Sequence, residues 1–326
     1  MVHLSARGRR SWRRPRAAGA RRVTAAAVAL LAACLLVALP HEHARAADEP
    51  GLDDATTSSG GARPPEGGAR RLVSLAPSVT ETVFELDRGD RLVGVSTFCD
   101  YPPEKVRDLP RAGSYLTPNV ERIVSLRPDV VIGVPTPGNQ AAVEQLRSLG
   151  LVVVIVGEHT IADTWKAIRT VGEWTGNPAG AAALIARLES EIGAVREAAA
   201  RLPKQKVLFV VGHDPLIAAG SGLFIDELIG IAGGINVAAA AGGSWPRLSL
   251  ETVIAAAPEV IIDGAMGSEV GKGLAAYWRS YASVPAVRDG RLFPQRSDAL
   301  LRPGPRLARG ARELFDMIHA SPRSAS

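Results

Sequence analysis

Two stretches of the chain can be laid on one another without a gap: Val120–Ile132, VERIVSLRPDVVI, and Leu250–Ile262, LETVIAAAPEVII. In both copies a glutamate lies in the first turn of a short predicted helix, a proline follows the helix, and an acid precedes a short apolar strand. Thr117 and Ser249 are the matching N-cap candidates, because hydroxyl side chains accept hydrogen bonds from the free N–H groups of a first turn. The repeated unit predicts two lobes of similar construction.

Between the two copies lies a long helical pattern, residues 177–202. Asn177 is a good N-cap, Pro178 suits the first helical position, and Pro203 ends the pattern. About 24 residues at 1.5 Å each give a rod of roughly 36 Å, which is long enough to join two lobes. The apolar residues that recur at helical spacing are Leu184, Leu188, Ile192, Val195 and Ala199.

Short, β-branched, apolar segments alternate with helical segments on both sides of this rod, which is typical of mainly parallel, helix-covered sheets. After the first strand, Ser78 and Glu81 fit a capping box, with Ser78 as N-cap and Glu81 at the third helical position. Further helices are expected over 224–231 and 306–319. The predicted strands are 72–75, 92–95, 130–134, 152–156, 207–211, 260–262 and 291–294. The fold class is therefore α/β, with two Rossmann-like lobes bridged by one long helix.

The basic charge of the chain is concentrated at its start. Residues 1–46 hold nine arginines and one acid, Glu42, which leaves 29 basic and 32 acidic residues and a net charge of −3 for the rest. Nucleic-acid binding therefore loses its compositional support. An arginine-rich stretch, an apolar run over 23–39 and the Ala-Arg-Ala triplet at 44–46 predict a signal peptide over 1–46, and so an exported, periplasmic protein.

A second processing route stays open at Cys34. Leu-Ala-Ala-Cys at 31–34 is similar to a lipoprotein box, which would anchor the protein to a membrane, although apolar residues follow the cysteine. Cys99 is the other cysteine, so export with cleavage leaves no intrachain disulfide. Residues 47–70 are rich in small, polar and charged residues and are expected to form a flexible leader.

The sequence lacks the common catalytic and phosphate-binding motifs. It has no Walker-type loop, no Gly-x-Ser-x-Gly elbow and no His-Glu-x-x-His zinc motif. The histidines of the folded part are single and scattered, so no metal site or intrinsic cofactor is predicted, and the chain is not expected to be an enzyme.

Several motifs resemble those of one family. They are Leu-Ala-Pro-Ser-Val-Thr-Glu at 75–81, Cys-Asp-Tyr-Pro-Pro at 99–103, Asn-Val-Glu-Arg-Ile-Val at 119–124, Ala-Gly-Gly-Ile-Asn at 232–236 and Trp-Pro at 245–246. The chain resembles, over about 71–319, the periplasmic cobalamin-binding proteins of the helical-backbone metal receptor superfamily. These are class III substrate-binding proteins of ABC importers. The resemblance implies a monomer that holds a metal-chelate ligand in a cleft between its lobes.

The resemblance gives the repeated glutamates a role. In the family one exposed glutamate in each lobe docks on arginines of the permease dimer, which works with an ATPase, and Glu121 and Glu251 match those positions. Two lobes that present the same charge suit a two-fold symmetric partner. The alternative is that each glutamate only complements a helix dipole, which is worth about 0.3–1 kcal/mol.

The cleft residues also follow from the resemblance. A corrin offers a broad, partly apolar face edged with amides, for which aromatic walls and a few polar groups are suitable. His213 could reach the metal of a corrin or haem, or be a solvated loop residue. Tyr101, Tyr115 and Trp245 match positions that line the family's cleft; the alternative is that each packs beneath its own loop. Asp298 and Arg302 match polar positions at the cleft edge. Ser78 could also meet an amide or carboxylate of the ligand, and His213 follows a C-lobe strand.

Alternatives remain. The cleft is less aromatic than the resemblance implies, with Val134 and Pro135 after one N-lobe strand, so a ferric siderophore or haem is the alternative ligand. An exported α/β enzyme or a sensor module using the same cleft is the alternative of another class. The expected division is a signal peptide 1–46, leader 47–70, N-terminal lobe 71–176, inter-lobe helix 177–202, C-terminal lobe 203–320 and disordered tail 321–326.

Overall fold

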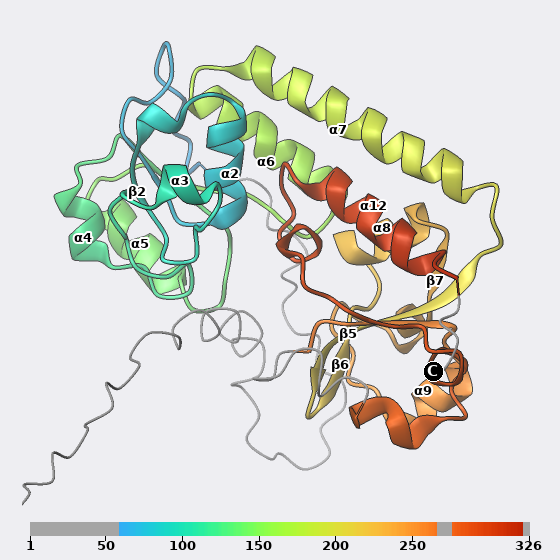
Figure 1. Ribbon diagram of the computed structural model, residues 1–326. Coiled ribbons are helices and arrows are strands. Elements are labelled where there is room, and N and C mark those ends of the chain that lie inside the picture. The colour runs from blue at the N-terminus through green and yellow to red at the C-terminus, as the bar shows by residue number, and fades with distance from the viewer. Residues whose placement is uncertain (1–58, 266–275, 322–326) are drawn as a thin grey trace, which may run out of the picture.

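A single long helix, α7 (Pro178–Ala199), connects two α/β lobes in the computed structural model, which describes residues 59–265 and 276–321 (Figure 1). The expected α/β class with two bridged lobes is confirmed. Within the described ranges, no helix has both the length and the apolar character needed to cross a membrane. The predicted signal peptide, Cys34, residues 47–58 and residues 322–326 lie outside the described residues.

The N-terminal lobe is built on a four-stranded parallel sheet of order β2-β1-β3-β4. Its central strands are fully buried, as expected for a sheet covered by helices on both faces. The strands are β1 (Leu72–Ser74), β2 (Leu92–Val95), β3 (Val130–Gly133) and β4 (Val153–Ile155). The helices are α2 (Pro77–Glu85), α3 (Pro103–Val106), α4 (Val120–Ser125), α5 (Gln140–Ser148) and α6 (Ile161–Trp174), with a 3₁₀ turn η2 (Gly89–Arg91).

The last residues of the expected leader belong to this lobe. Ala69 is buried, and its N–H donates to the carbonyl of Trp174 at 2.7 Å. The N–H of Arg70 donates to Asp129 at 2.8 Å. Gly68 (φ 78°) packs so closely on Gly176 that a Cβ would lie 2.3 Å from the Gly176 nitrogen, so the backbone contact requires glycine.

The C-terminal lobe has a five-stranded sheet of order β6-β5-β8-β9, in which β7 also pairs with β5. All pairs are parallel except β5 with β6, an antiparallel hairpin that the apolar pattern did not predict. The strands are β5 (Gln205–His213), β6 (Leu216–Ala218), β7 (Gly234–Asn236), β8 (Val260–Asp263) and β9 (Leu292–Pro294). The helices are α8 (Phe224–Ile231), α9 (Leu250–Ala256), α11 (Pro285–Arg288) and α12 (Leu307–Ile318), with 3₁₀ turns η3 (Val237–Ala241), η4 (Arg279–Tyr281) and η5 (Asp298–Leu300).

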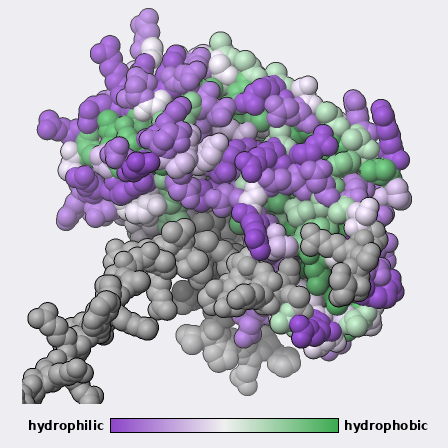
Figure 2. Space-filling view, in the orientation of Figure 1, coloured by the Kyte–Doolittle hydropathy of each residue, from purple (hydrophilic) through white to green (hydrophobic). Residues whose placement is uncertain are grey.

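Helix α7 is joined to both lobes by one continuous apolar core. Its N-cap is Asn177, as predicted, whose side chain accepts from the N–H of Gly180 at 3.0 Å. The helix packs on α6 of the first lobe and on α12 of the second (Figure 1). The core cluster that contains Leu188 and Ile192 includes strand residues of both sheets, so bending between the lobes would open buried apolar surface. Figure 2 shows hydrophilic side chains interspersed with small apolar patches over the face that includes α7.

Candidate ligand-binding cleft and docking helices

A pocket lies between the lobes at the carboxyl edge of the N-terminal sheet. Because β1, β3 and β4 run parallel, the segments that follow them meet at one edge, and they bring Ser78, Val134 and Glu158 together. The other lobe contributes Leu301 and Arg302, which follow η5. The pocket is also lined by Pro77 and Tyr115, and its empty space is about 340 Å³.

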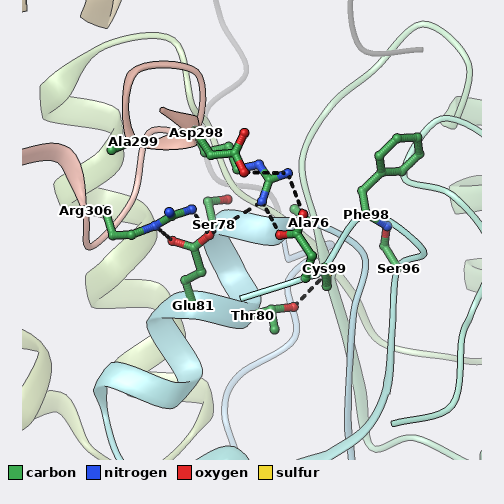
Figure 3. A network of polar contacts seen from close by, with 12 residues as sticks. Ala76, Ser78, Thr80, Glu81, Ser96, Phe98, Cys99, Asp298, Ala299 and Arg306 are labelled. Atoms are coloured by element: carbon green, nitrogen blue, oxygen red, sulfur yellow. Dashed lines mark hydrogen bonds and ion pairs between the residues drawn. The ribbon is translucent and has the colours of Figure 1, made fainter. Parts of the chain in front are cut away.

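A buried ion pair crosses between the lobes beside this pocket. Arg306, the residue before α12, donates from Nε and Nη2 to the two carboxylate oxygens of Glu81 on α2, at 2.7 and 2.6 Å. Glu81 is only 3% exposed, and Figure 3 shows the two side chains facing one another. Burial raises the pKa of Glu81, and the hydrogen bond from Arg306 partly opposes that rise. The pair therefore ties α2 to the C-terminal lobe.

Arg302 is surrounded by carboxylates. It lies 2.5 Å from Asp100 of the first lobe, 3.3 Å from Asp298 on η5 and 3.9 Å from Glu81. The Arg302 side chain is 11% exposed and lines the pocket, whereas the side chains of Asp100 and Asp298 are 61% and 44% exposed and reach solvent. The positive charge of Arg302 is therefore balanced within the protein.

The predicted capping box at the start of α2 is wrong. The helix starts at Pro77, its N-cap is Ala76, and no side chain caps it. The Ser78 hydroxyl instead donates to Oε1 of Glu158, and Glu81 pairs with Arg306. The sequence pattern was ambiguous because serine and glutamate three apart suit a cap and a polar cleft equally well.

Glu158 supplies the carboxyl group among the described residues that line the pocket. It follows β4 and is half-buried. Burial raises the pKa of Glu158 to about 7, the hydrogen bond from Ser78 and the charge of Arg302 lower it, and the charge of Glu81 raises it. A carboxyl group of this kind changes charge near neutral pH.

The three aromatic candidates occupy different places. Tyr115 lines the pocket, is 8% exposed, and makes an edge contact with Phe98 at 5.1 Å between ring centroids. Tyr101 is 38% exposed, and the guanidinium of Arg306 lies 4.4 Å from the centre of its ring. Trp245 is 39% exposed, and the preceding Ser244 lies 3.3 Å from His159 of the other lobe, so its loop reaches across beside Glu158.

His213 lies apart from these residues, at the end of β5. Its Nε2 is 2.8 Å from Oδ2 of Asp263, which also accepts from Nε1 of Trp278 at 2.8 Å. Its ring stacks on Tyr277 at 3.8 Å with an interplanar angle of 3°. Only Nδ1 is left for a ligand, and His213 does not line the pocket that Ser78 and Arg302 form.

Neither a reactive thiol nor a metal site is found in the described parts of the chain. Cys99 is buried and its sulfur accepts from the Thr80 hydroxyl at 3.0 Å, and burial raises the pKa of the thiol to about 11. Within residues 59–265 and 276–321, no group of three or more His, Cys, Asp or Glu residues could hold a metal ion.

The two copies of the sequence repeat form matching helices, α4 and α9. The N-cap of α4 is Asn119 and not the predicted Thr117, and its side chain accepts from the N–H of Arg122 at 2.8 Å. Ser249 caps α9 as predicted and accepts from the N–H of Thr252 at 3.1 Å. Asn119 and Ser249 are the equivalent positions of the gapless alignment, one residue before each aligned stretch, and asparagine is as favourable an N-cap as serine.

Both glutamates of the repeat are exposed at the second position of their helices. Glu121 lies in the first turn of α4 and Glu251 in the first turn of α9. The pKa of Glu251 is lowered by hydrogen bonds from its own backbone N–H and from the Ser249 hydroxyl, so its negative charge is favoured. Figure 1 shows α4 on one lobe and α9 on the other, both away from α7.

Sequence reasoning missed three residues of the polar cluster: Glu158, Arg306 and Asp100. Glu158 could have been found, because it follows an apolar strand of the parallel sheet, where polar side chains collect at the carboxyl edge. Arg306 and Asp100 could not, since their partners lie 225 and 202 positions away in the chain.

Comparisons with known proteins agree with this architecture. Residues 72–299 match the periplasmic binding protein family. The vitamin B12-binding protein of Salmonella typhi is 32% identical over 250 residues, which cover 77% of this chain and 90% of that protein.

Solved structures include binding proteins for two kinds of ligand. The periplasmic heme-binding protein RhuT from Roseiflexus sp. RS-1, in its apo form, has a TM-score of 0.70 and 33% identity, covering 78% of this chain and all of that one. The periplasmic vitamin B12-binding protein BtuF of Vibrio cholerae has a TM-score of 0.66 and 26% identity, covering 78% and 98%. Similarity alone therefore does not choose between the two ligands.

Proposed function

The chain belongs to the periplasmic binding protein family, and from this premise we propose that it captures a cobalamin between its lobes and delivers it to an ABC permease. In this role it is a carrier and not an enzyme. Its proposed ligand-contacting residues are Ser78, Tyr101, Tyr115, Trp245, Asp298 and Arg302. His213 lies outside the pocket and is proposed to contact only a part of the ligand that extends beyond it.

The observation that carries the choice of ligand is the charge balance of the pocket. Among the described residues that line it, the arginine is Arg302, and three carboxylates already surround it. Haem and many ferric siderophores are anionic and need uncompensated positive charge. A corrin edged with neutral amides needs no uncompensated positive charge, so the charge balance of the pocket supports a corrinoid ligand.

The pocket is too small to enclose a whole corrin, so the proposed ligand is partly exposed. The 340 Å³ of empty space includes open solvent, so only one edge of a corrin would enter the pocket and the rest would extend outwards between the lobes. Tyr101 and Trp245, each more than a third exposed, are then available as flat apolar contacts for the rest of the ligand.

Delivery would use the twin glutamates. Glu121 and Glu251 would meet arginines of a two-fold symmetric permease dimer, each lobe on one subunit, while an ATPase drives transport. The carrier would act as a monomer. It would be exported to the periplasm after loss of residues 1–46, or be held at the membrane if Cys34 is lipidated. Intact-mass measurement of the secreted protein distinguishes these two products.

The test is a titration of the mature protein with cyanocobalamin, haem and a ferric siderophore, followed by calorimetry and visible absorbance. We expect saturable one-to-one binding of cyanocobalamin and much weaker binding of the two anionic ligands. Tight binding of haem or siderophore without cyanocobalamin binding would contradict the choice of a corrinoid, and would leave the carrier role with the other ligand.

A further inference from the structure

Glu158 is a polar group of the cleft that neither the sequence motifs nor the docking role explains. It lies on the N-lobe wall of the pocket, directly after β4, and its Oε1 accepts the hydroxyl proton of Ser78. Ser78 belongs to α2, so two separate elements of the lobe hold this pair in place. The serine oxygen keeps its lone pairs, and Glu158 keeps its second carboxyl oxygen.

The surroundings of this pair are rich in negative charge. The charged groups that act on Glu158 are Glu81 from α2 and Arg302 from the segment after η5. Arg302 is balanced by Asp100 and Asp298, and Glu81 by Arg306. A ligand group beside Glu158 therefore meets hydrogen-bond acceptors and no uncompensated cation.

We propose that Glu158 and Ser78 form a subsite that accepts hydrogen bonds from a primary amide on the edge of the ligand and discriminates against a carboxylate at the same position. This subsite rests on the proposed corrinoid function and names the ligand group that the N-terminal lobe recognises.

The chemistry of the two groups explains the discrimination. The NH₂ of an amide supplies two donors, which match the acceptor oxygens of Glu158 and Ser78. A carboxylate supplies acceptors only, and it brings a second negative charge against Glu158 in a site that is half shielded from water. Like charges placed together in a binding site repel one another and weaken binding.

The protonation state of Glu158 provides an internal control. Its pKa of about 7 means that the group is mostly ionised at pH 8 and mostly protonated at pH 6. A ligand carboxylate, whose pKa is near 4, is ionised at both values. Repulsion of a carboxylate should therefore be strong at pH 8 and weak at pH 6.

The experiment compares cyanocobalamin with its isomeric monocarboxylic acids, in each of which one peripheral amide is replaced by a carboxylate. Affinities are measured by calorimetry at pH 6 and pH 8 for the wild type, Glu158→Gln and the exposed-site control Glu144→Gln on α5. At pH 8 we expect one isomer to bind the wild type and Glu144→Gln at least about tenfold more weakly than cyanocobalamin. The difference should shrink at pH 6 and disappear in Glu158→Gln, because this variant lacks the negative charge that repels the carboxylate.

Two results would overturn the subsite. One is equal binding of all isomers by the wild type at both pH values, which needs no variant to fold. The other is discrimination that persists unchanged in Glu158→Gln. A wild type that does not bind cyanocobalamin at all would instead reject the proposed function, and the subsite with it.

Discussion

The two lobes are most alike on the helices that face outward and least alike at the edges that face the cleft. Helices α4 and α9 share a side-chain N-cap, an exposed glutamate at the second position and a buried residue two positions later, Ile123 or Val253. Each is followed by a left-handed residue, Arg127 (φ 47°) or Ala257 (φ 49°).

The cleft edges of the two sheets have diverged. In the N-terminal lobe the segments after β3 and β4 contribute Val134 and Glu158 to the lining of the pocket. In the C-terminal lobe the ends of β5 and β8 carry His213 and Asp263, which bond to one another and, for Asp263, to Trp278. The matching helices α4 and α9 are suited to a two-fold symmetric partner, and the differing cleft edges are suited to an asymmetric ligand.

The largest expected effect comes from replacing the matched glutamates of the outward-facing helices α4 and α9. We expect the double exchange Glu121→Arg and Glu251→Arg to abolish uptake of labelled cyanocobalamin by cells that depend on this protein, with ligand affinity unchanged. Each single exchange should reduce uptake by a similar factor, since the two helices are equivalent. Glu144→Arg is the control, and uptake that survives the double exchange would remove the docking role.

Next comes the pair that ties the lobes together. Replacing Glu81 with alanine leaves Arg306 buried without its partner, so the free energy of unfolding should fall by about 3–5 kcal/mol. The exposed pair of Glu85 with Arg187 is the matched control on the same helix, and Glu85→Ala should cost less than about 1 kcal/mol. If urea unfolding gives Glu81→Ala and Glu85→Ala the same loss of free energy of unfolding, the pair between the lobes stabilises the protein no more than an exposed ion pair.

The raised pKa of Glu158 makes stability depend on pH. A carboxyl group whose pKa is higher in the folded state than in the unfolded state stabilises the fold at low pH. This contribution is lost as the pH rises from about 4.5 to about 7, by at most about 3 kcal/mol. Chemical unfolding measured across this pH range should show the fall in the free energy of unfolding for the wild type and not for Glu158→Gln. If both proteins show the same dependence of this free energy on pH, the raised pKa does not belong to Glu158.

A smaller effect is expected at the C-lobe edge. His213→Ala removes the hydrogen bond between the imidazole and the Asp263 carboxylate within the C-terminal lobe. The free energy of unfolding should therefore fall by about 1.5–3 kcal/mol. The visible spectrum of bound cyanocobalamin should stay the same. A spectral shift would show that His213 ligates the metal through Nδ1.

The sequence was sufficient for the architecture because its signals are local or repeated. The cap at Asn177, the helical spacing of Leu188 and Ile192 and the buried strands after Pro128 and Pro258 each depend on a few neighbouring residues. The antiparallel strand β6 was missed because its sequence, Leu-Ile-Ala, is buried throughout and lacks the apolar–polar alternation that marks an antiparallel strand.

The site was less predictable because its contacts join distant parts of the chain. Ser78 and Glu81 were assigned to a helix cap, since nothing near them in the sequence shows Glu158 or Arg306. The polarity of the pocket, and with it the choice between neutral and anionic ligands, depends on these long-range pairs.

The most direct test is amide hydrogen–deuterium exchange of the mature protein with and without cyanocobalamin. We expect slower exchange in segments from both lobes that border the cleft, 76–82, 156–160 and 298–303, and no change on α4 and α9. Protection on α4 and α9, or no protection in the cleft segments at saturating ligand, would contradict a carrier that holds cobalamin between its lobes and leaves its docking helices free.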